Sequence, residues 1–128
     1  MFYSTLTAPA SPPENVIATV LSSTEILVNW DSVPSVFQNG IITMYEVLYQ
    51  PQETFNNLIM SNNYLTIEDT SQTSVVIAGL QESVSYNISV RAYTSVGEGP
   101  FSEEIVVTTF EDCKYYNSAH HIKCFALV

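Results

Sequence analysis

The sequence predicts an all-β fold in which about seven short antiparallel strands pack as a sandwich. Runs of strand length alternate between apolar and polar side chains from about Pro9 to Thr109. Turn clusters separate these runs at a spacing of roughly 10 to 15 residues, and no helical period of comparable length interrupts them. With 128 residues, 46% of them hydrophobic, the chain is long enough for one domain with a packed core.

The first two predicted strands turn their apolar side chains toward a common core. Residues 16–20 and 26–30 each alternate between inward and outward positions, with a serine-rich turn between them. The alternation places Trp30, the only Trp of the chain, on the inward face, so we predict that it is a core residue. The segment before these strands, Pro9–Glu14, is rich in Pro and is predicted to be an extended lead-in.

A loop and a third strand are predicted next. Residues 31–40 are predicted to form a loop, because the pair Asn39 and Gly40 accommodates positive φ angles at little steric cost. Residues 45–50 alternate again, with Tyr45 on the inward face.

The second half of the chain supplies the remaining strands. The pattern is weakest over residues 52–63, where we predict a loop around a short strand. The strongest alternation runs over residues 84–94, with Tyr86 on the inward face and Asn87 on the outward face. The strands predicted after the third are an edge strand at 64–68 and strands at 74–78, 84–94 and 103–109.

These residues together resemble the fibronectin type III family. The resemblance covers Pro9 to about Thr109 and implies an immunoglobulin-like β-sandwich with antiparallel sheets of three and four strands. It also implies a tyrosine corner, in which the Tyr86 hydroxyl reaches backbone across a turn and Leu80 fills the space beneath the ring. The predicted structural core residues are Trp30, Tyr45, Leu80 and Tyr86. The motifs that carry the resemblance are Ser11-Pro12-Pro13, Trp30, Pro34 with Asn39-Gly40, Tyr45 with Val47 and Tyr49, Gly79-Leu80, YNISVRA at 86–92 and GEGPFS at 97–102.

The chain divides into three parts. Residues 9–110 are predicted to form the domain, residues 1–8 a leader or linker, and residues 111–128 an unstructured tail or a truncated neighbouring domain. Residues 1–8 lack the basic and apolar regions of a secretory signal peptide. No apolar run reaches the roughly 18 to 20 residues of a membrane span, so we expect no direct membrane insertion by this segment.

The charge balance narrows the classes of partner. The chain has 13 acidic and 3 basic residues, a formal net charge of -10, and Arg91 is the only basic residue between Pro9 and Phe110. Nucleic-acid binding needs Lys and Arg to neutralise phosphates, so we expect no nucleic-acid partner.

No catalytic residue, cofactor or metal site is predicted. The only His residues, His120 and His121, lie in the tail, away from any Ser nucleophile of the domain. With Cys113 and Cys124 they offer zinc-ligand types, but a disulfide loop or an unstructured tail explains the same residues. The acidic pairs of the domain lack a calcium-binding loop and are predicted to be solvated.

Asn87 is a candidate N-glycosylation site. Asn87-Ile88-Ser89 has the required pattern, and alternation places Asn87 on an outward face. The alternative is an unmodified polar surface residue.

The loops at one end of the sandwich form the candidate interaction surface, because loops on a rigid scaffold often carry function. They are residues 31–40, 69–73 and 95–101, with Val36, Phe37 and Phe101 as apolar anchors. An equally open interpretation is that these side chains cap the core. The candidate loop residues are Val36, Phe37, Asn39, Gly40, Gly97, Glu98, Gly99 and Phe101.

The resemblance implies a non-catalytic module that binds protein partners or spaces neighbouring domains of a longer cell-surface receptor or adhesion protein. The alternative is a cytoplasmic module of a muscle- or cytoskeleton-type scaffold. A third hypothesis, an accessory domain of a carbohydrate-active enzyme, requires a catalytic domain on the same polypeptide. A glycan on Asn87 would separate the first two, because only an exported chain meets the glycosylation machinery.

Overall fold

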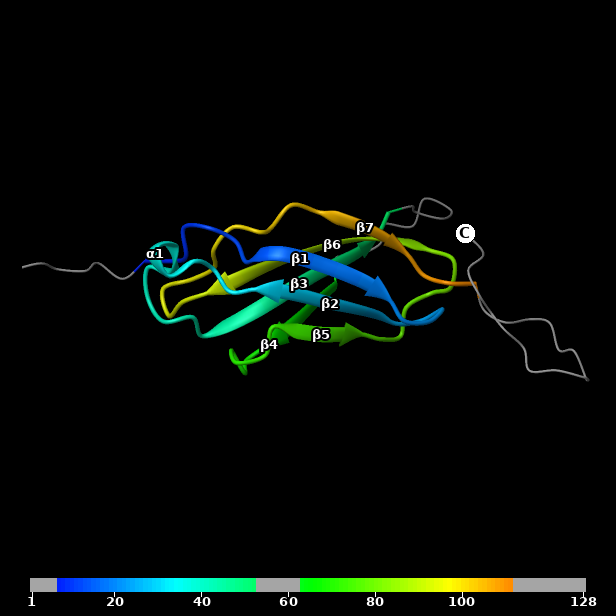
Figure 1. The fold of residues 1–128 in the computed structure, drawn as a ribbon, viewed down its shortest axis with the longest axis horizontal. Coiled ribbons are helices and arrows are strands. Elements are labelled where there is room, and N and C mark those ends of the chain that lie inside the picture. The colour runs from blue at the N-terminus through cyan, green and yellow to red at the C-terminus, as the bar shows by residue number, and fades with distance from the viewer. Residues whose placement is uncertain (1–6, 53–62, 112–128) are drawn as a thin grey trace, which may run out of the picture.

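The computed structural model describes residues 7–52 and 63–111 and has the predicted all-β architecture: two antiparallel sheets packed face to face (Figure 1). One sheet has the strand order β1-β2-β5 and the other has the order β4-β3-β6-β7. The three-stranded sheet comprises β1 (Glu14–Val20), β2 (Ile26–Asp31) and β5 (Ser74–Ile77). The four-stranded sheet comprises β3 (Met44–Pro51), β4 (Asn63–Ile67), β6 (Ser85–Tyr93) and β7 (Ile105–Thr108).

The core lies between the sheets and is built by strand alternation. Val28 on β2, Val47 on β3 and Ile88 on β6 are fully buried, because inward positions of both sheets face each other. Trp30 and Tyr45 are buried next to each other, with ring centroids 5.3 Å apart. The Tyr45 hydroxyl donates a hydrogen bond to Ser32 Oγ at 3.1 Å, at the end of the core.

The turn before β6 contains the tyrosine corner. Tyr86 is buried, and its hydroxyl accepts a hydrogen bond of 2.9 Å from the backbone N–H of Gln81, five residues earlier. Leu80 is buried in the same core, and its N–H donates to the carbonyl of Thr24. The corner therefore ties the turn at 80–85 to both sheets.

The segment at 31–40, predicted as a loop, contains one helical turn, α1 (Ser35–Gln38). Pro34 begins it with a φ of -53°, and its carbonyl accepts a bond from the Phe37 N–H. Asn39 ends it in the left-handed conformation, with a φ of 57°. Asn39 thus takes the positive φ that the sequence indicated, but at a helix end.

The predicted elements differ elsewhere only at their bounds. The last strand, β7, is shorter than the predicted run of 103–109, and β4 lies at the sheet edge as predicted for 64–68. The predicted short strand within 52–63 and the candidate zinc ligands Cys113, His120, His121 and Cys124 lie outside the described residues.

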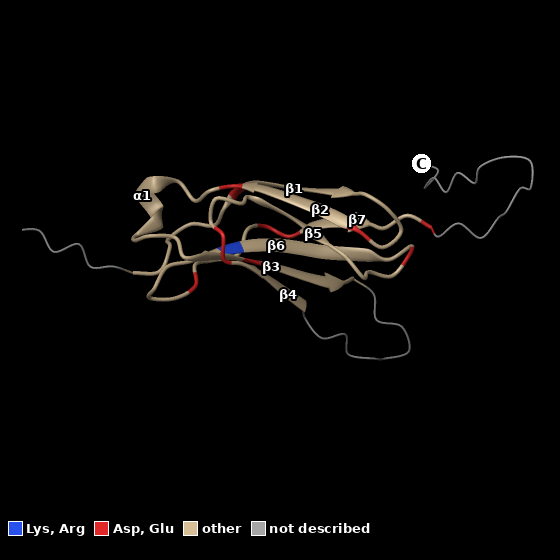
Figure 2. Ribbon diagram, turned by 90° about the horizontal axis from the view of Figure 1, so that it is seen from below, with Lys and Arg blue, Asp and Glu red and all other residues tan. Residues whose placement is uncertain are grey.

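The described chain enters and leaves the sandwich at opposite ends. The described chain begins beside α1, where the Thr7 N–H donates to the Asn39 carbonyl, and the segment after β7 leaves at the other end of the long axis (Figure 1). In the view from below, α1 again lies at one end of the long axis and the described chain leaves at the other end (Figure 2).

Candidate functional site

Three loops gather at the end of the sandwich where the described chain begins, and we call residues 32–43, 68–73 and 94–102 the loop pole (Figure 1). Antiparallel topology brings them together, because β2 and β6 end where β3 and β5 begin. The N–H of Trp30 donates to the Thr73 carbonyl at 3.0 Å, and the N–H of Thr43 donates to the Tyr93 carbonyl at 2.8 Å. These backbone bonds fix the bases of the loops.

The N-terminal segment Thr7–Ala10 runs across the loop pole and is hydrogen-bonded to two of its loops. Its bonds to the α1 loop are Thr7 N to the Asn39 carbonyl at 3.1 Å, Ala10 N to the Phe37 carbonyl at 2.8 Å, and Asn39 Nδ2 to the Ala8 carbonyl at 3.2 Å. On the other side, the Thr94 hydroxyl donates to the Thr7 carbonyl at 2.9 Å. Thr7 and Ala8, which the sequence pattern places in the leader, are thus bonded to the loops of the domain.

Pro9, at the middle of this segment, is buried against the loop that follows β6. A Cβ on Gly99 would lie 2.8 Å from the Pro9 Cβ and 3.1 Å from its carbonyl oxygen. Gly99 itself is buried and donates its N–H to the Ala92 carbonyl at 2.8 Å. Gly99 is therefore needed for this close approach of two backbone segments.

Four large apolar side chains of the loop pole are exposed. The exposed fractions are 76% for Val36, 45% for Phe37, 84% for Ile41 and 58% for Val96. Val36 and Phe37 belong to the predicted interaction surface, whereas Ile41 and Val96 are not among its predicted residues. Both lie outside strands, where alternation no longer assigns a side chain to the core.

The other predicted loop residues have backbone roles in the described structure. Gly40 and Gly97 each have a φ of 157°. Gly97 exchanges backbone hydrogen bonds with Thr94, and Glu98 pairs with Tyr93 in an isolated antiparallel β-bridge. These residues shape the turns on which the exposed side chains are mounted.

Phe101, the third predicted anchor, is half-buried and covered by Arg91. The Arg91 guanidinium carbon lies 4.3 Å from the centroid of the Phe101 ring and 5.3 Å from that of Tyr93. The Phe101 ring thus contacts a cation of its own chain, whereas the side chains of Val36 and Phe37 are exposed.

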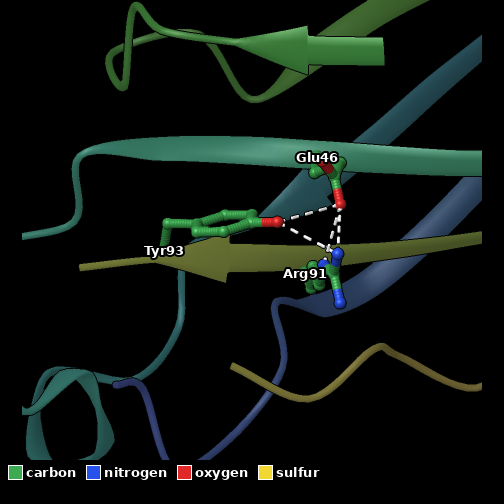
Figure 3. A network of polar contacts seen from close by, with 3 residues as sticks. All are labelled: Glu46, Arg91 and Tyr93. Atoms are coloured by element: carbon green, nitrogen blue, oxygen red, sulfur yellow. Dashed lines mark hydrogen bonds and ion pairs between the residues drawn. The ribbon is translucent and has the colours of Figure 1, made fainter. Parts of the chain in front are cut away.

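Arg91 also belongs to a polar network on the outer face of the four-stranded sheet (Figure 3). Two hydrogen bonds and an ion pair meet at Glu46 Oε1: Arg91 Nε donates to it at 2.8 Å, the Tyr93 hydroxyl donates at 3.2 Å, and Arg91 Nη2 forms an ion pair with it at 2.6 Å. The Tyr93 hydroxyl also accepts a bond from Arg91 Nη2 at 3.0 Å. Glu46 and Arg91 are direct cross-strand partners of β3 and β6, which explains why the pair forms.

The network shifts two pKa values. Burial raises the pKa of the Tyr93 hydroxyl, and although the charge of Arg91 opposes this, Glu46 adds to it, so the pKa lies above its ordinary value. Burial lowers the pKa of Arg91, but the hydrogen bond and charge of Glu46 outweigh it and raise the pKa overall. Arg91 therefore keeps its positive charge, and the carboxylate of Glu46 compensates that charge.

The other charged residues of the described chain are Asp and Glu, which are scattered along the ribbon in Figure 2. Arg91 is the only basic residue of the described chain, and Glu46 neutralises it. On the pole, Asp69 accepts bonds from the side chain and the backbone N–H of Ser71, which lower its pKa. Within the described residues, no group of three His, Cys, Asp or Glu side chains is placed to hold a metal ion.

Asn87 lies on β6 between Gln50 of β3 and Val106 of β7, on the outer face of the sheet. Its side chain is half-buried.

No helix in the part of the chain that the structure describes is long and apolar enough to cross a membrane.

Comparison with known proteins gives a consistent set of matches. A family model described as "Fibronectin type III domain" matches residues 11–108. The chain is 36% identical over 104 residues to Protein sidekick-1 of Gallus gallus, which covers 81% of this chain and 5% of that protein. It is 34% identical over 110 residues to Cell adhesion molecule DSCAM of Rattus norvegicus, covering 85% of this chain and 5% of that protein.

Among solved structures, the third fibronectin III domain of human KIAA0343 protein superimposes with a TM-score of 0.77 at 28% sequence identity. The superposition covers 92% of this chain and 96% of that one. The similarity thus extends over whole domains, whereas this chain spans a small fraction of the length of the curated relatives.

Proposed function

This chain belongs to the fibronectin type III domain family, and we propose that it serves as a non-catalytic spacer and protein-interaction module of a longer cell-surface adhesion or receptor protein. Its relatives support the setting, because they include a protein named as a cell adhesion molecule, of which this chain spans 5%. They favour the cell-surface hypothesis over the cytoplasmic scaffold.

The observation that carries the proposal is the position of the two ends of the described chain. The described chain begins beside α1 and leaves after β7 at the opposite end of the long axis, so a module joined at each end would lie in line with this domain (Figure 1). A domain whose two ends met on one side would fold a string of modules back on itself. The sandwich therefore suits a spacer.

We place the interaction surface at the loop pole and assign it to the module that precedes this one in the longer protein. Thr7 is bonded to the Asn39 carbonyl and to Thr94, so the incoming chain is held against both loops. A preceding module is thereby brought next to Val36 and Ile41, whose exposed apolar surface it can bury.

Surface location is tested on the native protein in cells that express it. An antibody against the folded domain should stain intact cells, and external protease should remove the epitope. Staining that requires permeabilised cells would favour the cytoplasmic scaffold and overturn the proposal.

The loop pole is tested by replacing Val36 and Ile41 with Ser in this chain and in the protein with its preceding module. Both residues are exposed, so the unfolding free energy of the single domain should change by less than about 0.5 kcal/mol. In the longer protein, hydrogen exchange at the loop pole should become faster in the variant than in the wild type. Equal exchange rates in the two longer proteins would show that the preceding module does not cover this surface.

A further inference from the structure

The outer face of the four-stranded sheet contains the only Asn-X-Ser/Thr triplet in the chain, Asn87-Ile88-Ser89. Attachment of an oligosaccharide to such a triplet makes a bond to the Nδ2 atom of the Asn. The folded structure can keep that product only if Nδ2 faces solvent and the space above it is free.

The amide of Asn87 is oriented in this way. Tyr86 and Ile88, its neighbours in the strand, are buried in the core, so the side chain of Asn87 projects from the opposite face of β6. Its oxygen, Oδ1, is buried without a hydrogen-bond partner in the described structure. Its nitrogen, Nδ2, makes no hydrogen bond to a described group and is not fully buried. Nδ2 is therefore the atom of the amide that meets solvent.

Asn87 lies close to the edge of its sheet. Asn87 is one strand away from β7, which is an edge strand of the sheet. Its cross-strand partner on β7 is Val106, whose side chain is 51% exposed, and its partner on β3 is the uncharged Gln50. An N-acetylhexosamine on Nδ2 can lean over this open edge and cover the apolar surface of Val106.

We infer that Asn87 carries an N-linked oligosaccharide that covers the β6-β7 side of the four-stranded sheet. This inference rests on the proposed function, because only an exported chain meets the transferring enzyme. In the transfer, Nδ2 attacks the anomeric carbon of a polyprenyl-diphosphate-linked oligosaccharide. The N–C bond forms, the bond from that carbon to the phosphate oxygen breaks, the polyprenyl diphosphate leaves, and Nδ2 loses one proton.

The burial of Ser89 fixes when this happens. Ser89 is 2% exposed in the folded domain, so its hydroxyl is out of reach of an enzyme that must read the triplet. The oligosaccharide is therefore added before β6 pairs with its neighbours, and a chain that has already folded is not a substrate.

The test is expression of the 128-residue chain behind a cleavable secretion leader in mammalian cells. We expect the intact mass of the secreted protein to exceed the polypeptide mass by one oligosaccharide. Peptide N-glycosidase should remove it and convert Asn87 to Asp. The Asn87→Gln and Ser89→Ala variants should lack the added mass, while Ser89→Thr, which keeps a hydroxyl, should retain it.

The fluorescence of Trp30 reports whether each secreted variant is folded, so loss of sugar is distinguished from loss of structure. A folded, secreted wild-type chain of unmodified mass would overturn the inference and leave the proposed function in place. Failure of the native protein to reach the cell surface would overturn the proposed function, whatever sugar the leader-directed chain carries.

Discussion

Replacing Arg91 with Met removes the only basic side chain of the described domain and leaves Glu46 without its ion-pair partner. In the wild type Arg91 Nε and the Tyr93 hydroxyl donate to Glu46 Oε1, and Arg91 Nη2 forms an ion pair with it. The variant retains only the Tyr93 hydroxyl, 3.2 Å away. Met preserves most of the aliphatic length but removes the guanidinium that lies 4.3 Å from the Phe101 ring centroid, so the cation–π contact is lost as well. The perturbation is therefore chiefly the loss of compensation for a carboxylate of low exposure.

The expected cost follows from the exposure of the two side chains, which is 21% for Arg91 and 11% for Glu46. Removing one partner of a fully buried pair costs about 3–5 kcal/mol, whereas an exposed pair contributes about 0.2–1 kcal/mol. Because this pair lies between the limits and nearer the buried one, we expect Arg91→Met to lower the unfolding free energy by about 2–3 kcal/mol. Replacing Glu46 with Leu as well should restore all but about 1 kcal/mol, since no carboxylate is then left uncompensated.

Urea unfolding followed by the fluorescence of Trp30 measures this effect, because Trp30 is the only Trp and is 3% exposed when folded. With a slope of about 1 kcal/mol per molar urea, the midpoint should fall by about 2–3 M in Arg91→Met. Glu104→Gln, at an exposed acidic position, is the matched control and should stay within about 0.5 kcal/mol of the wild type. A loss below about 0.5 kcal/mol for Arg91→Met, or a double variant as unstable as the single one, would refute the argument.

Three further predictions concern the hydrogen bonds and contacts that hold the loops. Tyr86→Phe leaves the Gln81 N–H without its acceptor and should lower the free energy of unfolding in urea by about 1–2 kcal/mol. An unchanged midpoint would show that this hydrogen bond does not stabilise the fold. Gly99→Ala places a methyl group 2.8 Å from the Pro9 Cβ. It should lower the free energy of unfolding by about 1–3 kcal/mol and speed proteolysis of the N-terminal segment. Unchanged stability and proteolysis would show that this segment is not docked in solution. Because the folded pKa of Tyr93 is raised, the stabilisation from its neutral form is complete below about pH 10 and is lost as the pH rises through the folded pKa. Stability should therefore fall more steeply above about pH 10 in the wild type than in Tyr93→Phe, and parallel curves would contradict this.

Much of the fold could be predicted because each strand carries its own pattern. The alternation in residues 26–30 assigned Trp30 to the core, and the structure buries it. The resemblance to the fibronectin type III family implied a tyrosine corner at Leu80 and Tyr86, and the bond from Gln81 to the Tyr86 hydroxyl forms there. These features depend on side-chain period and local turn geometry, which are properties of a short stretch of chain.

The candidate site was predicted less completely, because loops have no period. Asn39 has the positive φ that its pairing with Gly40 predicts, yet it ends a helical turn for which the sequence carries no periodic signal. Phe101 is a candidate apolar anchor or core cap by sequence, and in the structure its ring lies against the Arg91 guanidinium. Ile41, the most exposed of the large apolar side chains at the loop pole, carried no signal of its own.

Local alternation and composition are sufficient to predict the strands, the central core and the acidic character of the domain. The environment of the outward-facing positions depends instead on how the strands pair and pack. Glu46 belongs to the outer face by alternation, yet it is 8% exposed, because the register of β3 with β6 places Arg91 opposite it. The docking of Thr7 beside Thr94 likewise joins residues 87 positions apart. Such contacts arise between segments that each look solvent-facing alone, so their partners are known only once the sheets are in register.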